Sequence, residues 1–105
     1  MDIKTNLEAM LAAGQDSAML RYTLGNAYLK DGDLDAAIAH LEAAVKLDPG
    51  YSAAWRSYAK ALSESGAVAS AIQAYETGIE VAERKGDMQA AKEMRVFLKR
   101  LKKTS

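Results

Sequence analysis

The sequence repeats itself with a period of 34 residues, and this feature constrains the fold more than any other. A shift by one period places Gly32 on Gly66 and Ala37 on Ala71, so that small residues match small residues. A fixed internal period of this length is typical of stacked copies of one supersecondary unit. The other matched pairs are Leu24 and Tyr58, Ala27 and Ala61, Tyr28 and Leu62, Ile38 and Ile72, Leu41 and Tyr75, Glu42 and Glu76, and Val45 and Ile79.

Each copy contains two amphipathic helices. Apolar residues such as Leu34, Ile38 and Leu41 recur at steps of three and four, which places them on one helical face. The pattern is interrupted at Gly32 and Asp33. A glycine can end a helix in the left-handed conformation, and an aspartate can cap the next one. We therefore predict a helix, a tight turn and a second, antiparallel helix in each repeat.

The turns between and around the repeats are marked by the same residue types. Pro49 and Gly50 end the first helix pair, so that the next helix begins near Tyr51 or Ser52. Gly86 ends the second pair. We expect an all-α chain of about six helices in a single domain, with an N-terminal capping helix at 3–14, repeats at 18–51 and 52–85, and a C-terminal capping helix at 86–103.

The N-terminal helix has a possible start signal of its own. Thr5, followed three residues later by Glu8, has the spacing of a capping box, and Gly14 supplies a stop. We therefore predict that Thr5 caps a short helix here. Two copies are fewer than the roughly three that a stable stack needs, so this helix and the C-terminal one are expected to cover the exposed ends.

Composition agrees with an all-helical chain and narrows its setting. The 105 residues include one proline, seven glycines and no cysteine, and half of them are hydrophobic. Disulfides are thereby excluded, and neither a signal peptide nor a membrane-spanning run is evident, so we expect a cytoplasmic protein without a membrane contact. The net charge is zero, but residues 84–103 carry eight basic and two acidic groups.

The repeated positions resemble the tetratricopeptide-repeat signature. In the first copy they are Leu24, Gly25, Tyr28, Ala37, Leu41, Ala44 and Pro49, and in the second they are Trp55, Tyr58, Ala59, Leu62, Ala71, Tyr75 and Gly78. Two positions depart from the signature. Arg21 stands where the family usually has tryptophan, and Glu83 stands where it usually has proline. Without that proline, the second helix of the second repeat is expected to continue to Lys85.

The resemblance implies a right-handed superhelix (α-solenoid) whose concave groove holds a peptide or a partner protein, without catalysis. In the family, groove residues come from the second, fifth, ninth and twelfth positions of the first helix of each repeat. Tyr22 and Asn26 would offer an aromatic ring and an amide, while Arg56 and Lys60 would attract an acidic group. The corresponding positions are Met19, Tyr22, Asn26 and Leu29, followed by Ala53, Arg56, Lys60 and Ser63.

Other interpretations of these surfaces stay open. The groove positions are also compatible with an ordinary solvated face, and Glu64 stands where it can neutralise Lys60. Val96 and Phe97 interrupt the charged face of the last helix and offer a surface for self-association, although a monomer is favoured. Some family members clamp a carboxylate with a lysine and an asparagine, of which this chain keeps only Asn26.

The basic tail is the other candidate surface. Its cations can meet nucleic-acid phosphates or an acidic protein, but no aromatic residues interleave to stack on bases, so nucleic acid is disfavoured. Lysines in a last helical turn also suit the helix dipole. The residues concerned are Lys92, Arg95, Lys99, Arg100, Lys102 and Lys103.

Catalytic and metal-binding patterns are weak. The segment from Asp31 through Glu42 imitates a calcium loop, but Ala36 stands where that loop needs glycine, and a turn followed by a capped helix accounts for the same residues. His40 is the single histidine and has no cysteine or second histidine to share a metal with. We therefore predict a protein that is not an enzyme, with no metal and no cofactor.

Overall fold

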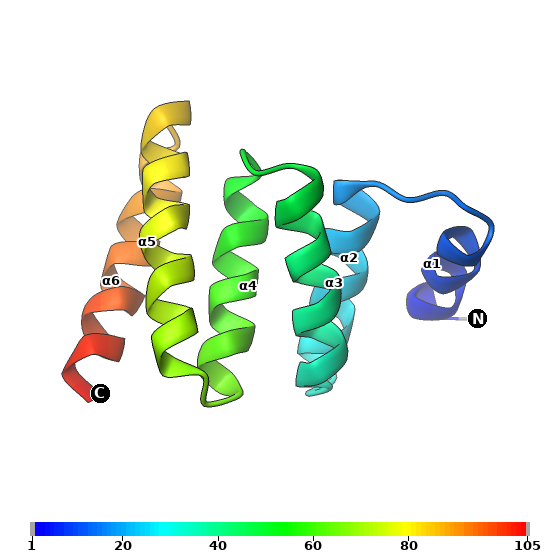
Figure 1. Cartoon of the computed structure of the whole chain (residues 1–105), viewed down its shortest axis with the longest axis horizontal. Helices are drawn as coiled ribbons and strands as arrows, with labels where there is room; N and C mark the ends of the chain where they lie inside the picture. Colours follow the sequence, from blue (N-terminus) through cyan, green and yellow to red (C-terminus); the bar gives the residue numbers. More distant parts are fainter. Residues whose placement is uncertain (1, 105) are drawn as a thin grey trace.

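A computed structural model describes residues 2–104, and in this range it consists of helices joined by short turns (Figure 1). From α2 onward, successive helices run antiparallel and each packs against the next, while α4 also contacts α2 and α6, so that the helices form a row two helices deep. The all-helical repeat architecture predicted from the sequence is confirmed. The helices are α1 (Ile3–Ala12), α2 (Ala18–Lys30), α3 (Leu34–Leu47), α4 (Ser52–Glu64), α5 (Val68–Lys85) and α6 (Met88–Thr104).

The turn residues adopt the conformations that the sequence predicts. Gly32 follows α2 with φ +80°, and Gly86 follows α5 with φ +76°, both in the left-handed region that favours glycine. Asp33 caps α3, because its Oδ1 accepts a hydrogen bond from the backbone nitrogen of Ala36 at 3.3 Å. The Gly-then-Asp sequence therefore ends one helix and begins the next, as expected.

The predicted N-cap of α1 is wrong. The helix begins at Ile3, and its cap is Asp2 rather than Thr5. The Asp2 carboxylate accepts hydrogen bonds from both the backbone nitrogen of Thr5, at 2.9 Å, and the Thr5 hydroxyl, at 3.1 Å. A carboxylate satisfies the free N–H groups of a first turn well.

The hydrophobic core runs along the row of helices and is largest where α4, α5 and α6 meet. Leu41 and Met94 are fully buried, on α3 and α6 respectively. Because each cluster joins neighbouring helices, the core is distributed along the stack, as expected for repeat proteins. The main cluster contains Ala59, Leu62, Ala71, Ala74, Tyr75, Ile79, Ala82, Ala90, Ala91 and Met94.

Two helical glycines allow the closest contacts between helices. A Cβ on Gly25 of α2 would lie 2.6 Å from Cγ of Leu41, which is too near for any real carbon pair. A Cβ on Gly78 of α5 would lie 2.7 Å from Sδ of Met94 and 3.0 Å from Cβ of Trp55. The missing side chains thus set the spacing between α2 and α3, and between α5 and both of its neighbours.

Helix α5 is longer than its counterpart in the first repeat. It has 18 residues, whereas α3 has 14. It continues through Glu83, the position at which the family usually has proline, and ends at Lys85 as predicted. Glu83 forms an ion pair with Arg95 of α6. The last turn of α5 consequently projects beyond the turn that joins α3 to α4 (Figure 1).

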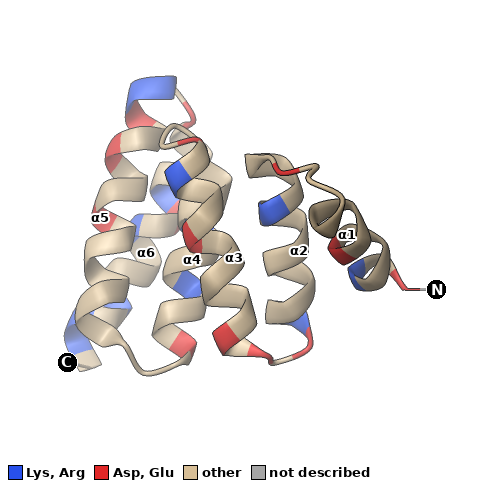
Figure 2. Cartoon of the chain, turned by 45° about the vertical axis from the view of Figure 1, so that its right-hand side comes forward, with Lys and Arg blue, Asp and Glu red and all other residues tan. Residues whose placement is uncertain are grey.

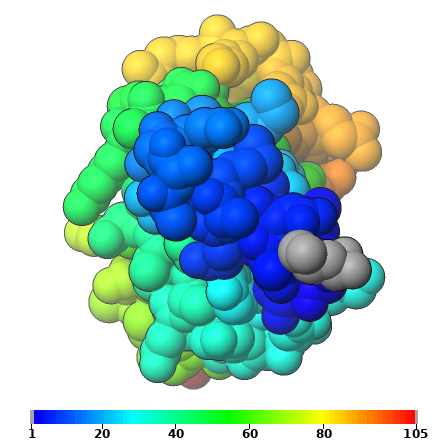
Figure 3. Space-filling model, turned by 90° about the vertical axis from the view of Figure 1, so that its right-hand side faces the viewer, coloured from blue at the N-terminus to red at the C-terminus, as the bar shows by residue number. Residues whose placement is uncertain are grey.

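Helix α1 is attached differently from the others. It has no buried residue, and it lies across the N-terminal end of the row, with α2 as its main helical neighbour (Figures 1 and 3). Ile3 and Met10 remain exposed. Its apolar stripe therefore contributes less packing than the equivalent stripes of α2 to α6.

Candidate functional site: a hollow between α2, α4 and α6

A hollow of about 320 Å³ lies between α2, α4 and α6, with α5 contributing one side chain to its wall. We call it the central hollow. Helix α4 is its middle element, because it contacts both α2 and α6. The lining residues are Tyr22, Asn26, Leu29, Arg56, Ser57, Lys60, Tyr75, Glu93 and Phe97.

The structure brings together five of the predicted groove residues. Tyr22, Asn26 and Leu29 on α2 face Arg56 and Lys60 on α4 across this hollow. The remaining predicted residues do not reach it. Met19 and Ala53 line a separate depression near the α3–α4 turn, and Ser63 lies at the opposite end, beside Phe97 and Leu101.

The two cations of the hollow differ in their surroundings. Nη1 of Arg56 donates a hydrogen bond to Oε2 of Glu93 on α6, at 2.8 Å, and both side chains are partly exposed. Lys60 forms no ion pair within residues 2–104, so the expected pairing with Glu64 does not occur there. One cation is therefore neutralised by the protein, while the other faces solvent.

An aromatic pair forms the wall on the side of α6. Tyr75 of α5 is 3% exposed and stacks on Phe97, with ring centroids 6.1 Å apart and planes 16° apart. Burial raises the pKa of the Tyr75 hydroxyl, and the nearby Glu64 carboxylate adds to this effect. The Arg100 guanidinium lies over the other ring, 5.8 Å from the Phe97 centroid. Phe97 therefore contacts two side chains of the molecule but stays 42% exposed.

The sequence interpretation missed the contribution of α6. Glu93 and Phe97 are four residues apart, so they lie on one face of that helix, next to the stripe that includes Met94. From the sequence, the charged side of this helix is expected to be the solvated outside of a cap, and Phe97 is assigned to a surface for self-association rather than to a groove. The four-residue spacing of Glu93 and Phe97 is a signal that could identify this face. It can be used only if α6 is assumed to lie beside α4 as α4 lies beside α2.

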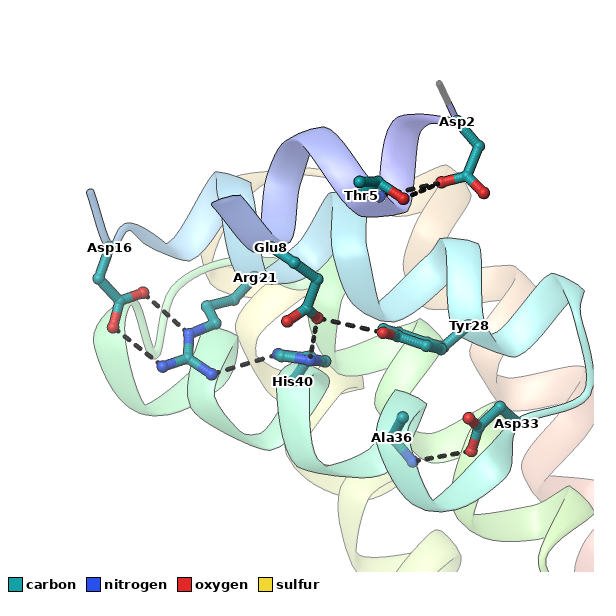
Figure 4. A network of polar contacts seen from close by, with 9 residues as sticks. All are labelled: Asp2, Thr5, Glu8, Asp16, Arg21, Tyr28, Asp33, Ala36 and His40. Atoms are coloured by element: carbon teal, nitrogen blue, oxygen red, sulfur yellow. Dashed lines mark hydrogen bonds and ion pairs between the residues drawn. The ribbon is translucent and has the colours of Figure 1, made fainter. Parts of the chain in front are cut away.

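A second set of polar contacts joins α1 to the stack (Figure 4). The Arg21 guanidinium donates two hydrogen bonds to Asp16, at 2.9 and 3.1 Å, and one to Nδ1 of His40 at 3.2 Å. Since arginine only donates, Nδ1 accepts, and the ring proton resides on Nε2. Nε2 lies 3.3 Å from Oε1 of Glu8, which also accepts a bond from the Tyr28 hydroxyl at 3.2 Å.

This network explains both the arginine at the usual tryptophan position and the single histidine. His40 stacks on Tyr28 with ring centroids 5.6 Å apart, and Lys4 of α1 pairs with Asp31. All of these groups connect α1 or the α1–α2 loop to α2 and α3. The network attaches α1 by polar contacts where packing is weak.

In the acidic segment that resembles a calcium loop, two of the carboxylates already have partners within the protein. Asp33 caps α3 and Asp31 pairs with Lys4. Within residues 2–104, no group of three or more potential metal-binding side chains gathers at one place. No helix in that range is long and apolar enough to cross a lipid bilayer.

Comparison with known proteins identifies the family. The sequence model described as tetratricopeptide repeat matches residues 22–87. A TPR repeat-containing protein of Pseudomonas aeruginosa is 50% identical over 95 residues, which cover 90% of each chain. A solution structure from Bordetella parapertussis is 46% identical with a TM-score of 0.85, covering 99% of this chain and 90% of that one.

A more distant structure shares the fold. It is a tetratricopeptide repeat domain protein from Salinibacter ruber, 26% identical with a TM-score of 0.79, and the match covers 86% of this chain and 91% of that one. The family match spans more than half of the present sequence and includes both of the closely packed glycines, Gly25 and Gly78. This chain belongs to the tetratricopeptide-repeat family.

Proposed function

We propose that the chain is a non-catalytic protein-interaction module that binds a short acidic segment of a partner protein in the central hollow. The observation that carries the proposal is the convergence of Tyr22, Asn26, Arg56 and Lys60 on one hollow. Family membership supports the general role, because tetratricopeptide repeats typically bind proteins or peptides. The acidic character of the guest follows from the exposed Lys60.

The lining offers a distinct contact for each part of a peptide. The Asn26 amide can both donate to and accept from a peptide backbone, and the Tyr22 ring offers an aromatic surface. The Lys60 ammonium is available for a carboxylate. A guest carboxylate can also replace Glu93 at Arg56, because a partly exposed ion pair contributes only about 0.2–1 kcal/mol.

The test replaces both cations and measures partner capture. Because Arg56 holds Glu93, a reversal to glutamate there would place two carboxylates together and disturb α6, so Arg56→Gln combined with Lys60→Glu is the cleaner variant. Pull-down from native lysate with mass spectrometry identifies the partners of the wild-type chain. The variant is expected to lose them, with helix content and melting temperature nearly unchanged.

A matched control has the same change in charge on a different surface. Lys92→Gln combined with Lys99→Glu alters exposed positions of α6 that do not line the central hollow. This control is expected to retain the partners. If the variant with Arg56→Gln and Lys60→Glu captures the partners as well as the control does, the central hollow is not the binding site.

The basic face of α6 is a weaker candidate for the interaction surface. Basic residues recur along this helix, as Figure 2 shows in blue. Several of them already have partners, since Arg95 pairs with Glu83, Lys102 lies 3.6 Å from Glu76, and Arg100 covers Phe97. These contacts reduce the charge that is available to a nucleic acid, and binding of nonspecific RNA or DNA across a salt series tests the surface directly.

Self-association is the remaining alternative, and α6 carries exposed apolar side chains that could take part in it. Val96 is 45% exposed, and Phe97 is 42% exposed although it contacts Tyr75 and Arg100. We expect a monomer. Light scattering at two concentrations that differ about a hundredfold tests this, and a mass that rises with concentration would favour the alternative.

A further inference from the structure

A second hollow has a volume of about 290 Å³, and none of the residues that line it lines the central hollow. It is formed where the last turns of α5 project beyond the α3–α4 turn, and we call it the turn hollow. Within α5 its residues recur at steps of four, three and one, which places them on one helical face. Its lining consists of Pro49, Gly50, Trp55, Thr77, Val81, Arg84 and Lys85.

The inner part of the turn hollow is apolar. Nε1 of Trp55 donates a hydrogen bond to the carbonyl oxygen of Pro49 at 2.8 Å, so the single polar atom of the indole is engaged. Val81 is 7% exposed and contributes only carbon. A partly buried indole and an aliphatic wall together suit a bulky apolar side chain.

The rim of the turn hollow is cationic. Arg84 and Lys85 are exposed, and neither side chain forms a hydrogen bond or an ion pair with any residue in the range 2–104. The side chain of Lys85 bends over the turn, because a Cβ placed on Gly50 would lie 3.1 Å from its Cε and 3.3 Å from its Nζ. Both charges are therefore positioned at the edge of an apolar surface.

Two acidic groups, Asp48 and Glu83, lie near the turn hollow but do not line it. Oδ1 of Asp48 accepts a hydrogen bond from the backbone nitrogen of Gly50 at 3.1 Å. Glu83, in the last turn of α5, pairs with Arg95. None of the residues that line the turn hollow is acidic, so Arg84 and Lys85 give it a positively charged edge, which is complementary to an acidic ligand.

The spacing of the apolar and cationic parts limits the form of that ligand. Val81 and Lys85 are four residues apart on α5, which is about 6 Å along a helix axis. In an extended peptide, residues i and i+2 lie on the same side and are about 6.6 Å apart. An apolar side chain and a carboxylate separated by one residue therefore match both parts of the turn hollow at once.

We propose that the turn hollow is a second peptide-binding site, which holds an extended partner segment with a bulky apolar residue over Trp55 and Val81 and a carboxylate, two residues later, at Arg84 and Lys85. The site depends on the length of α5. Arg84 and Lys85 reach the hollow because the helix continues through Glu83.

The chain contains a built-in reporter for this site. Trp55 is the single tryptophan, so its fluorescence reports on the turn hollow directly. The probe is the peptide acetyl-Gly-Leu-Thr-Glu-Gly-amide, titrated into the full chain. We expect a saturable change in tryptophan emission. The peptides with Gln in place of Glu, or Ser in place of Leu, are expected to bind at least about tenfold more weakly, since each lacks one of the two contacts.

Variants then locate the site. Arg84→Gln combined with Lys85→Gln should weaken binding of the Glu peptide by about tenfold or more, whereas Lys92→Gln combined with Lys99→Gln, which removes the same charge from α6, should not. Circular dichroism checks that both variants keep their helix content. Equal affinity of the two variants, or equal affinity of the Glu and Gln peptides, would overturn the proposal.

One further variant separates this site from the central hollow. Arg56→Gln combined with Lys60→Glu is expected to bind the Glu peptide as the wild-type chain does, because neither residue lines the turn hollow. If that variant loses the peptide while the Arg84 and Lys85 variant retains it, the peptide binds in the central hollow. The turn hollow is then not the site, and the proposed function is unaffected.

Discussion

Arg56 on α4 and Glu93 on α6 form a 2.8 Å ion pair that spans the central hollow. The carboxylate of Glu93 thus occupies the position at which an acidic guest would approach Arg56. It acts as an internal competitor, and it also links the last helix to the middle of the stack.

Removal of this competitor should strengthen the binding of acidic guests. Glu93→Gln keeps the shape of the side chain and releases Arg56, so the affinity of an acidic partner segment is expected to rise about one and a half- to fivefold, the equivalent of an exposed ion pair. Isothermal titration calorimetry measures the change. Glu83→Gln, which releases Arg95 instead, serves as the control, and an unchanged or reduced affinity for the Glu93 variant would contradict the competitor role.

The contact between Gly25 and Leu41 predicts a loss of stability on adding one methyl group. Gly25→Ala places a Cβ 2.6 Å from Leu41 Cγ and 3.3 Å from its backbone nitrogen, so the helices must separate. We expect a destabilisation of about 1–3 kcal/mol from overpacking, which exceeds the gain of about 0.5–1 kcal/mol from helix propensity. Urea denaturation tests this. Ser70→Ala, at an exposed position of α5, should change the free energy of unfolding little.

Glu8 holds α1 through Tyr28 and His40, so its truncation should loosen that helix selectively. For Glu8→Ala we expect faster amide hydrogen exchange in 3–12 and unchanged exchange in α4 and α5. The cost in global stability is expected to stay below about 1 kcal/mol, because the side chain is partly exposed. Glu80→Ala, an exposed change on α5, is the control. Equal acceleration along the whole chain would argue against a local attachment.

As the pH is lowered, α1 should detach from the stack before the other helices unfold. The hydrogen bonds from Arg21 lower the pKa of Asp16, and the backbone hydrogen bond from Thr5 lowers the pKa of Asp2. Both carboxylates are thus more acidic in the folded chain, so their stabilisation is present above the unfolded pKa of about 4 and is lost as pH falls through the lower folded values. Amide signals of α1 recorded by NMR should change at a higher pH than those of α4. Simultaneous changes would contradict this order.

Raising the pH should ionise Tyr75, in the aromatic wall of the central hollow, and lower the stability of the fold. Burial raises the pKa of Tyr75, so above the unfolded value of about 10 the unfolded chain ionises first and stability falls with rising pH. Phe97→Ala uncovers the ring and should move the pKa of Tyr75 back towards its ordinary value. Spectrophotometric titration near 295 nm follows the change. An identical titration curve for the variant would show that Phe97 does not shield the hydroxyl.

The sequence predicts local features well because they depend on neighbouring residues. The Asp33 cap, the left-handed Gly32 and the end of α5 at Lys85 all follow from a few adjacent side chains. The N-cap of α1 was predicted wrongly because Asp2 and Thr5 are both good caps. Two such caps differ so little in free energy that residue preferences alone do not distinguish between them.

Features that join distant segments were not predictable in the same way. Glu93 reaches Arg56 across 37 positions of sequence, and Arg21 reaches His40 across 19. Each pairing depends on which helix lies beside which, and on the rotation of each about its axis. The period places α2 beside α3 and α4 beside α5, but it gives no register for α6. The α6 side of the central hollow therefore appeared only in the structure.

The close glycine contacts also bear on the thermodynamics of binding. Gly25 against Leu41, and Gly78 against Met94, leave little free space for the helices to shift, while adjacent faces of α2 and α6, together with α4, line the central hollow. A host of this kind loses little conformational entropy when a guest enters. The entropy loss then falls almost entirely on the partner segment. A segment that is already extended and stiff should bind more tightly than a flexible one with the same side chains.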